Sequence, residues 1–263
     1  MSVRGPRPAV SPLWRMVLMQ TRAQLRVVWR TPAFSLTSLV LPLMFFTFFG
    51  LPLAHLTRAD GVGMATYLLA SFGAYSVGAV MVYSFGIGVA TERGMGVDRL
   101  IRATPMPPAL YMLAKVFTAS VFACVSLVLL FLYGMITAGI QLPLTTWLAM
   151  MLRLLSGSVP FMGLGFAIGY LAGPSAAPAV ANLVYLPLSF ASGLFVPIDQ
   201  LPRAAQHVAP YLPSYHYAQL AWGALGARVE PAAVSVLWLA AYAVVLFGLA
   251  VRGFRREERE KFT

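Results

Sequence analysis

The sequence contains little charge, and acidic residues are its scarcest charged class. Only 10% of its 263 residues are charged, with 19 Lys and Arg against 8 Asp and Glu, whereas about a quarter of the residues in soluble domains are charged. Hydrophobic residues make up 59% of the chain, and the mean hydropathy is +0.77. This composition excludes a cytosolic enzyme and a disordered tail, and it indicates a chain that lies in a lipid bilayer.

Cysteine is almost missing, and the residues that bind metals are dispersed. The single cysteine, Cys124, has no partner in the chain, which excludes a secreted disulfide scaffold. The three histidines, His55, His207 and His216, are scattered, and none forms a close pair with a carboxylate on one helix face. We therefore expect no metal site and no cofactor bound by this chain.

Carboxylates are missing from the apolar runs of the chain. All eight lie elsewhere, at Asp60, Glu92, Asp98, Asp199, Glu230, Glu257, Glu258 and Glu260. A proton-coupled carrier normally holds an ionisable residue within the membrane, and a lipid-modifying enzyme needs a nucleophile and a base at one depth. The phosphate-binding loop of nucleotide hydrolases is absent as well. We therefore expect that the chain is not an enzyme, and that energy for any work comes from another chain.

Six apolar runs are each long enough to cross a hydrocarbon core of about 30 Å as a helix. They cover residues 32–54, 67–90, 113–136, 154–172, 176–196 and 232–251, and Lys115 is the one charged residue within them. The alternating pattern of a membrane β-strand is absent. These runs predict an all-α integral membrane protein in which residues 1–263 form one domain with six transmembrane helices.

The distribution of basic residues predicts the orientation of these helices. Fifteen of the 19 Lys and Arg lie in residues 1–30, in residues 93–115 or after residue 251. By the positive-inside rule, both termini are cytoplasmic and the chain spans the cell (inner) membrane. Membrane topology and anionic lipid then account for the positive charge, and no nucleic-acid partner is expected.

Two segments outside the spans have a distinct pattern. Residues 13–30 repeat apolar side chains at helical spacing, with arginines on another face, which predicts an interfacial amphipathic helix. Residues 197–231, called the outer segment below, combine prolines with Tyr and Trp. This favours short interfacial or re-entrant helices before the last span, and an inert aromatic belt is the alternative.

Small residues recur every four positions in two of the spans. They are Ala74 and Gly78 in the second span and Gly165, Gly169 and Gly173 in the fourth. Because such stripes let helix backbones approach closely, we expect them to serve helix packing.

The connection at residues 91–110 is the one substantial cytoplasmic loop. Its sequence, TERGMGVDRLIRATPMPPAL, mixes opposite charges with Leu100 and Ile101 and then reaches a group of prolines. A short amphipathic helix that prolines terminate is typical of a docking site for a soluble partner.

In this loop the sequence resembles the type-2 permeases of ATP-binding-cassette exporters. In that family the second span is followed by a Glu, by a Gly four residues later, by an amphipathic turn and by Thr-Pro. The corresponding residues here are Glu92, Gly96, Leu100, Thr104 and Pro105. The form GVDRLIRATPM is most similar to the daunorubicin-exporter branch. The six spans, the amphipathic amino-terminal helix and the SGLFVPIDQLP stretch after the fifth span extend the resemblance over nearly the whole chain.

The resemblance implies the membrane-spanning subunit of an ATP-driven exporter. Its substrate would be hydrophobic or amphipathic, such as a drug, as in multidrug or antibiotic resistance, or a lipid or glycolipid. Its partners would be two ABC ATPase subunits, which hold ATP and Mg²⁺, and a second permease copy or a paralogue, in contact with membrane lipid. The resemblance assigns coupling to the ATPase to Glu92, Arg93, Gly96, Asp98, Arg99, Leu100, Arg102, Thr104 and Pro105. Glu92 would pair with a basic residue either of the ATPase or of the same chain.

Two alternatives from other functional classes stay open at this point. An integral membrane enzyme acting on lipid predicts titratable residues clustered at one depth. An ion-coupled secondary transporter predicts inverted repeats with broken helices at matching places. The sequence shows neither pattern plainly.

Overall fold

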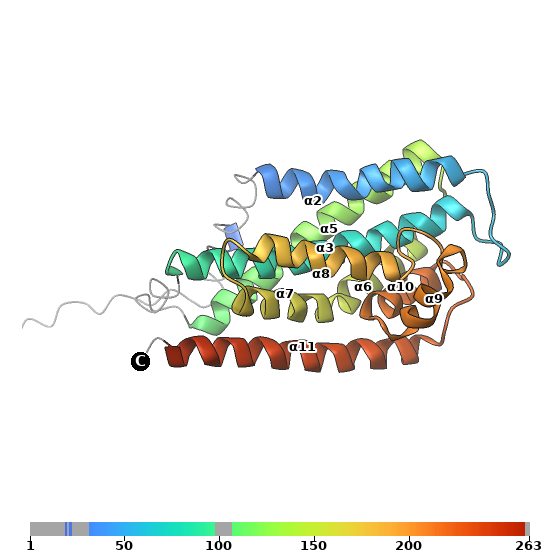
Figure 1. Ribbon diagram of the computed structural model, residues 1–263. Coiled ribbons are helices and arrows are strands. Elements are labelled where there is room, and N and C mark those ends of the chain that lie inside the picture. The colour runs from blue at the N-terminus through green and yellow to red at the C-terminus, as the bar shows by residue number, and fades with distance from the viewer. Residues whose placement is uncertain (1–18, 20, 23–31, 98–106, 261–263) are drawn as a thin grey trace, which may run out of the picture.

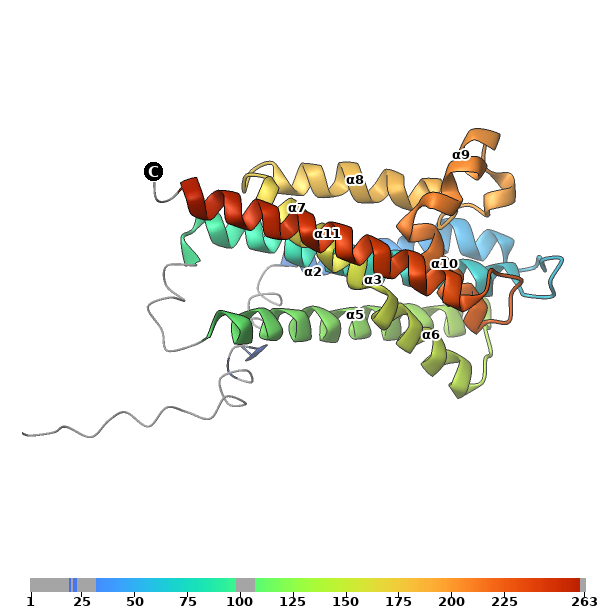
Figure 2. The ribbon, with the colours of Figure 1, turned by 90° about the horizontal axis from the view of Figure 1, so that it is seen from below.

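The computed structural model describes residues 32–97 and 107–260, together with residues 19, 21 and 22. Within these ranges the protein is helical, and an isolated bridge between Thr57 and Gly63 is the only β-type pairing. Figures 1 and 2 show an elongated bundle of long helices, with the C-terminus at one end and α9 and α10 at the other. We call the end that holds the C-terminus the loop end, because α3 ends there and α5 begins there.

The helices form from apolar stretches whose backbone groups are satisfied within each helix, as a bilayer requires. They are α2 (Pro32–Phe45), α3 (Met64–Gly94), α5 (Pro108–Ala138), α6 (Leu144–Gly157), α7 (Val159–Leu171), α8 (Ala177–Ala191), α9 (Arg203–Val208), α10 (Pro213–Ala224) and α11 (Ala232–Glu260). A π-helical turn, η1 (Phe46–Gly50), and a 3₁₀ turn, η2 (Leu51–Leu53), continue α2, while η3 (Ile198–Gln200) and η4 (Ala209–Tyr211) flank α9. Proline stands in the first turn of α5, α7, α8 and α10, where its missing N–H is tolerated.

Helix α3 is the centre of the bundle. It packs against α5, α7, α8 and α10, and every residue from Tyr67 to Val82 is buried. Helix α11 packs on α7 and α10 and leaves much of its remaining surface exposed, including Leu237, Val244 and Val245. Apolar side chains on the outside of a helical bundle suit contact with lipid, so the core lies around α3 and the lipid-facing surface lies on the outer helices.

Among the described residues, four helical stretches are long and apolar enough to cross a membrane. They are Met64–Gly94, Leu110–Ala138, Leu144–Leu171 and Ala232–Arg256. Two other apolar helical stretches, Ser38–Leu53 and Ala177–Ala191, are shorter than the roughly 20 residues that a span usually needs. The structure thus supports an all-helical, multi-pass membrane protein, while the count of six spans stays a prediction.

The predicted fourth span, residues 154–172, corresponds to two helices. The first, α6, begins at Leu144, ten residues before the predicted start, and Ser158 separates it from α7. The Ser158 hydroxyl donates to the Leu155 carbonyl at 2.7 Å, and Pro160 lies in the first turn of α7. Arg153 lies within α6, and its Nη1 donates to the Leu220 carbonyl of α10 at 3.3 Å. Helix α6 therefore extends beyond the apolar run and contacts the outer segment.

The outer segment folds into η3, α9, η4 and α10. All residues of α10 from Pro213 to Trp222 are buried, and the helix packs on α3, α6 and α11. Side chains in an inert belt at the membrane surface would be exposed to headgroups. Helix α10 is instead a packed part of the bundle. The predicted interfacial helix at residues 13–30 lies outside the described residues, apart from residues 19, 21 and 22.

Candidate functional site

The candidate site is the base of the charged loop, where α3 ends and α5 begins. Helix α3 ends at Gly94, and Gly96 adopts a φ of +70°, a left-handed conformation that glycine takes readily and that turns the chain away from the helix. Helix α5 starts at Pro108. Six of the predicted coupling residues lie outside the described residues: Asp98, Arg99, Leu100, Arg102, Thr104 and Pro105. The described part of the site is therefore the base that holds this loop.

An ion pair joins the two helices at the loop base. Lys115 Nζ of α5 donates to Glu92 Oε2 of α3 at 2.5 Å, and the two side chains are 6% and 21% exposed. The Lys115 ammonium also lies 5.6 Å from the centre of the Tyr111 ring. A buried ammonium needs such a partner, because taking it out of water is costly. Of the two pairings that the sequence left open for Glu92, the structure has the one within the chain.

The next residue joins α3 to a third helix. Arg93 Nη1 donates to the carbonyls of Gly169, at 2.5 Å, and Ala172, at 3.4 Å, at the C-terminal end of α7. Carbonyls at the end of a helix are short of partners and carry partial negative charge, so a guanidinium stabilises them. The Arg93 guanidinium also lies 5.6 Å from the Tyr170 ring, and that ring meets Phe254 of α11 edge-on at 5.5 Å.

The loop base, which we define as Glu92, Arg93, Lys115, Gly169 and Ala172, thus connects α3 to α5 and α7. Displacing the end of α3 would therefore strain its contacts with both α5 and α7. The described residues contain no group of three His, Cys, Asp or Glu that could hold a metal ion.

Comparison with known proteins gives the same assignment along most of the chain. Residues 16–225 match the family model described as ABC-2 type transporter. The chain belongs to the ABC-2 type transporter family. It is also 30% identical over 239 residues to the "Putative transport permease YvfS" of Bacillus subtilis (strain 168), covering 91% of this chain and 96% of that protein. The family membership implies a transport permease that works with an ABC ATPase subunit.

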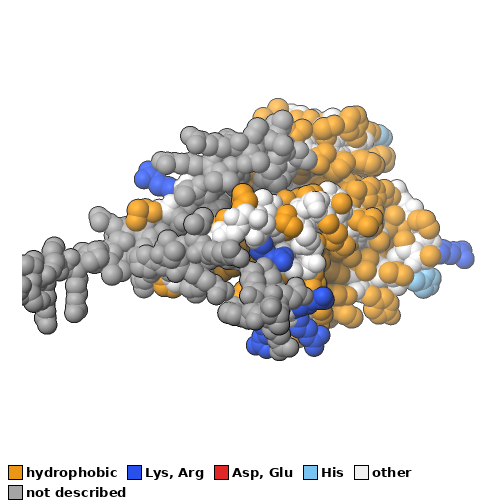
Figure 3. All heavy atoms as spheres, turned by 60° about the vertical axis from the view of Figure 1, so that its left-hand side comes forward, with side chains coloured by type: hydrophobic (Ala, Val, Ile, Leu, Met, Phe, Trp, Pro, Cys, Tyr) orange, Lys and Arg blue, Asp and Glu red, His pale blue; other side chains and the backbone are white. Residues whose placement is uncertain are grey.

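The surface of this ABC-2 permease differs between its flank and its ends. Figure 3 shows a flank covered mainly by hydrophobic side chains, with Lys and Arg lying toward the two ends. At the loop end, Arg252, Arg255 and Arg256 of α11 are exposed. Basic side chains at this end suit a surface that meets anionic headgroups or an acidic protein partner.

Two glycines of the small-residue stripes lie where α7 packs on α3. A Cβ added at Gly165 would lie 2.9 Å from the Met81 and Val82 carbonyl oxygens, and one at Gly169 would lie 2.8 Å from the Phe85 carbonyl oxygen. These two glycines therefore allow α7 to approach the backbone of α3.

The other small residues of the two stripes differ in how closely neighbouring atoms approach them. Gly78 faces Tyr185 of α8, whose hydroxyl donates to the Tyr75 carbonyl at 2.8 Å, and Ala74 is fully buried. Gly173 has open space around its Cβ position, so nothing in the structure requires glycine there.

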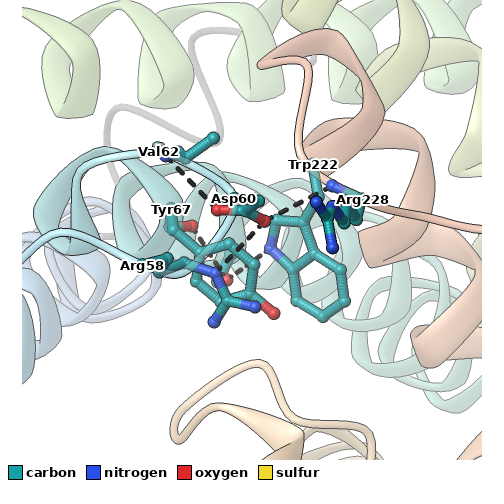
Figure 4. A network of polar contacts seen from close by, with 7 residues as sticks. Arg58, Asp60, Val62, Tyr67, Trp222 and Arg228 are labelled. Atoms are coloured by element: carbon teal, nitrogen blue, oxygen red, sulfur yellow. Dashed lines mark hydrogen bonds and ion pairs between the residues drawn. The ribbon is translucent and has the colours of Figure 1, made fainter.

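A second polar cluster, at the opposite end of the bundle, joins the 54–63 connection to the outer segment (Figure 4). The Arg58 guanidinium lies 4.1 Å from the centre of the Tyr67 ring, and that ring stacks on Trp222 of α10 at 4.6 Å. Asp60 accepts hydrogen bonds from the backbone N–H groups of Val62 and Arg228, both at 3.3 Å.

The electrostatics of Asp60 follow from these contacts. Burial acts to raise its carboxyl pKa, but the two backbone hydrogen bonds and the Arg58 charge act in the other direction, and the net pKa is lowered from 3.8. Asp60 is therefore an ionised link between the 54–63 connection and the chain that precedes α11.

Sequence reasoning placed Glu92, Arg93 and Gly96 in the site and assigned Gly169 to helix packing, but it missed how these residues connect. Lys115 was visible as the one charge inside an apolar run, which was a signal that it needs a carboxylate nearby. The Arg93 contacts with α7 carbonyls leave no trace in the sequence, because any residue type supplies a carbonyl.

Proposed function

We propose that this ABC-2 permease is the membrane subunit of an ATP-driven exporter that moves a hydrophobic or amphipathic compound out of the cytoplasm or the inner leaflet. The loop base is the observation that carries the proposal, together with the family membership. The loop at residues 95–107 docks on an ABC ATPase, which binds ATP and Mg²⁺. Movement of the ATPase displaces the loop, and the loop base passes this displacement to α5 and α7.

The orientation in this proposal rests on the distribution of basic residues. The loop end, with Arg252, Arg255 and Arg256, faces the cytoplasm, and the outer segment faces the opposite side of the cell membrane. Both termini are then cytoplasmic. The loop end also lies where a soluble ATPase could reach it.

The surface formed by α3 and α8 is where we place a second permease copy. Tyr83 Oη donates to Asn182 Oδ1 at 2.9 Å, and Asn182 is exposed on the outside of the bundle. Asn182 Nδ2 donates to the Pro178 carbonyl at 3.0 Å, which leaves its second N–H without a bond among the described residues. An amide facing lipid is unfavourable, whereas an interface or a water-filled passage satisfies it. A passage between two copies would also give an amphipathic substrate both apolar and hydrogen-bonding contacts.

Copurification tests the ATPase coupling. The tagged permease is purified from its native host in mild detergent, and the eluate is assayed for ATPase activity and for subunit masses. We expect a stoichiometric nucleotide-binding subunit whose ATPase rate rises when lipophilic compounds are added. Glu92→Gln should retain the subunit but reduce this stimulation, whereas the control Arg203→Gln, at an exposed side chain of α9 at the opposite end of the bundle, should behave as wild type. A permease that purifies alone under every detergent and lipid condition would contradict the proposal.

A further inference from the structure

His216 of α10 is a buried imidazole that the proposed transport function does not use. It is 1% exposed, and its ring stacks on Trp238 of α11 with 5.2 Å between the ring centres and 10° between the ring planes. Tyr215 lies beside the ring edge-on at 5.3 Å. The imidazole is thus enclosed at the contact between α10 and α11, at the end of the bundle opposite the loop end.

The hydrogen bonds of the ring determine which nitrogen carries the proton. His216 Nε2 lies 2.8 Å from the Pro210 carbonyl oxygen of η4. A carbonyl only accepts, so Nε2 carries a proton and donates it. In the neutral ring Nδ1 then has a bare lone pair. This Nδ1 is buried, and no described residue forms a hydrogen bond with it.

The bare nitrogen points toward a carboxylate. His216 Nδ1 lies 3.8 Å from Glu230 Oε2, and the Glu230 side chain is 38% exposed. Glu230 is held in place from two sides, because Tyr215 Oη donates to its Oε1 at 3.4 Å and its own backbone N–H donates to Gln219 Oε1 at 3.3 Å. The Glu230 carboxylate is in contact with solvent, so it offers a route by which a proton from water can reach His216 Nδ1.

The surroundings of His216 have opposing effects on the pKa of its imidazole. Burial lowers the His216 pKa, whereas the Pro210 carbonyl and the Glu230 charge raise it, and the net pKa lies below 6.5. Other titratable or charged groups on or next to the surrounding elements include Asp60, Tyr67, Arg153, Tyr185, His207, Tyr211, Tyr215, Tyr217, Arg228 and Tyr242. The lowered carboxyl pKa of Asp60 and the raised phenol pKa of Tyr215 keep each of these two groups in one charge state between pH 5 and 8.

We propose that His216 and Glu230 form a proton-binding site of the outer segment. The ligand is a proton from the aqueous phase at this end of the bundle, and it binds at Nδ1 without any covalent step. The resulting imidazolium keeps the Nε2 hydrogen bond to Pro210 and directs its Nδ1–H toward Glu230, but it stays enclosed where burial disfavours its charge. A conformation in which the outer segment opens and water reaches the ring binds the proton more tightly. Acidification therefore favours opening of the contact between η4, α10 and residues 225–231, which lead into α11.

The first test observes the proton directly. The full chain, carrying His55→Gln and His207→Gln so that His216 is the remaining histidine, is labelled with ¹³C at the imidazole and titrated by NMR in nanodiscs between pH 5 and 8. We expect a midpoint below 6.5, and a further fall when Glu230→Gln removes the facing charge. Asp199→Asn, at an exposed carboxylate of the same segment, should leave the midpoint unchanged. The proposed site would be overturned by a titration midpoint of 6.5 that is the same in the wild-type background and in the Glu230→Gln variant.

The second test asks whether the proton loosens the segment. Hydrogen exchange of residues 225–230, corrected for the intrinsic effect of pH, is compared at pH 5.5 and 7.5. We expect exchange in the wild-type chain to become about threefold faster at the lower pH, because opening lets water solvate the imidazolium. His216→Gln should abolish this difference, whereas Glu230→Gln, which removes the charge that favours the imidazolium, should enlarge it. Each variant is first required to match the wild-type exchange of α3 at pH 7.5, which shows that it is folded. Equal corrected exchange at both pH values in the wild-type chain would overturn the proposed loosening.

Discussion

The ion pair of the loop base predicts a specific pattern of stability in single and double variants. Glu92→Gln leaves the Lys115 ammonium 6% exposed and without its carboxylate. Breaking a fully buried pair in this way costs about 3 to 5 kcal/mol. Because Glu92 is itself 21% exposed, we reduce the expected loss in the free energy of unfolding to about 2 kcal/mol. Lys115→Met should cost about 1 kcal/mol, since the remaining carboxylate can turn toward water.

The double variant Glu92→Gln/Lys115→Met separates pairing from packing. It removes both charges and keeps similar side-chain volumes, so its stability should return to within about 1 kcal/mol of wild type. Unfolding is followed by circular dichroism during titration with dodecyl sulfate in mixed micelles, with Arg255→Gln as the control. The reasoning fails if Glu92→Gln unfolds at the wild-type midpoint, or if the two single losses simply add in the double variant.

Three further predictions concern packing and the cluster at the opposite end. Gly165→Ala should lower the free energy of unfolding by about 1 to 3 kcal/mol, because the added Cβ would lie 2.9 Å from α3 backbone oxygens. Gly173→Ala places its Cβ in open space, so this variant should unfold at the wild-type midpoint in the dodecyl sulfate titration. Trp222→Phe should lower the free energy of unfolding by about 1 kcal/mol, because it removes the 2.9 Å hydrogen bond from Nε1 to the Ser71 hydroxyl. The prediction is contradicted if the same change at an exposed tryptophan lowers the free energy of unfolding by as much. The lowered pKa of Asp60 means that its ionised form stabilises the fold above pH 3.8 and that this contribution disappears as the pH falls through the lowered value. Thermal unfolding of Asp60→Asn should therefore vary less with pH than wild type in that acidic window, and parallel curves would refute the assignment.

The sequence was sufficient for the class of protein and for its family. Long apolar runs and scarce charge predict membrane helices, since burying unpaired charge in hydrocarbon is costly. The order of Glu92, Gly96, Thr104 and Pro105 after an apolar run indicated the family, and the family model confirms it.

Sequence patterns were weaker where tertiary packing decides the outcome. The outer segment has the same Tyr and Trp content whether it lies in a headgroup zone or packs into the bundle, so composition did not reveal that α10 is buried from Pro213 to Trp222. The partner of Glu92 stayed open for a similar reason, because Lys115 is 23 residues away in the chain and becomes its neighbour only when α3 and α5 lie side by side.

The two consecutive residues Glu92 and Arg93 restrict how α3 can move. Neighbouring positions on an α-helix are separated by about 100° around its axis, so the two side chains reach different neighbours, α5 and α7. Rotation of α3 about its own axis would pull at least one of them away from its partner. Tilting or sliding of α3, α5 and α7 together preserves both contacts. The permease therefore has few low-energy degrees of freedom at this end, and the ones that remain are rigid-body movements of three helices.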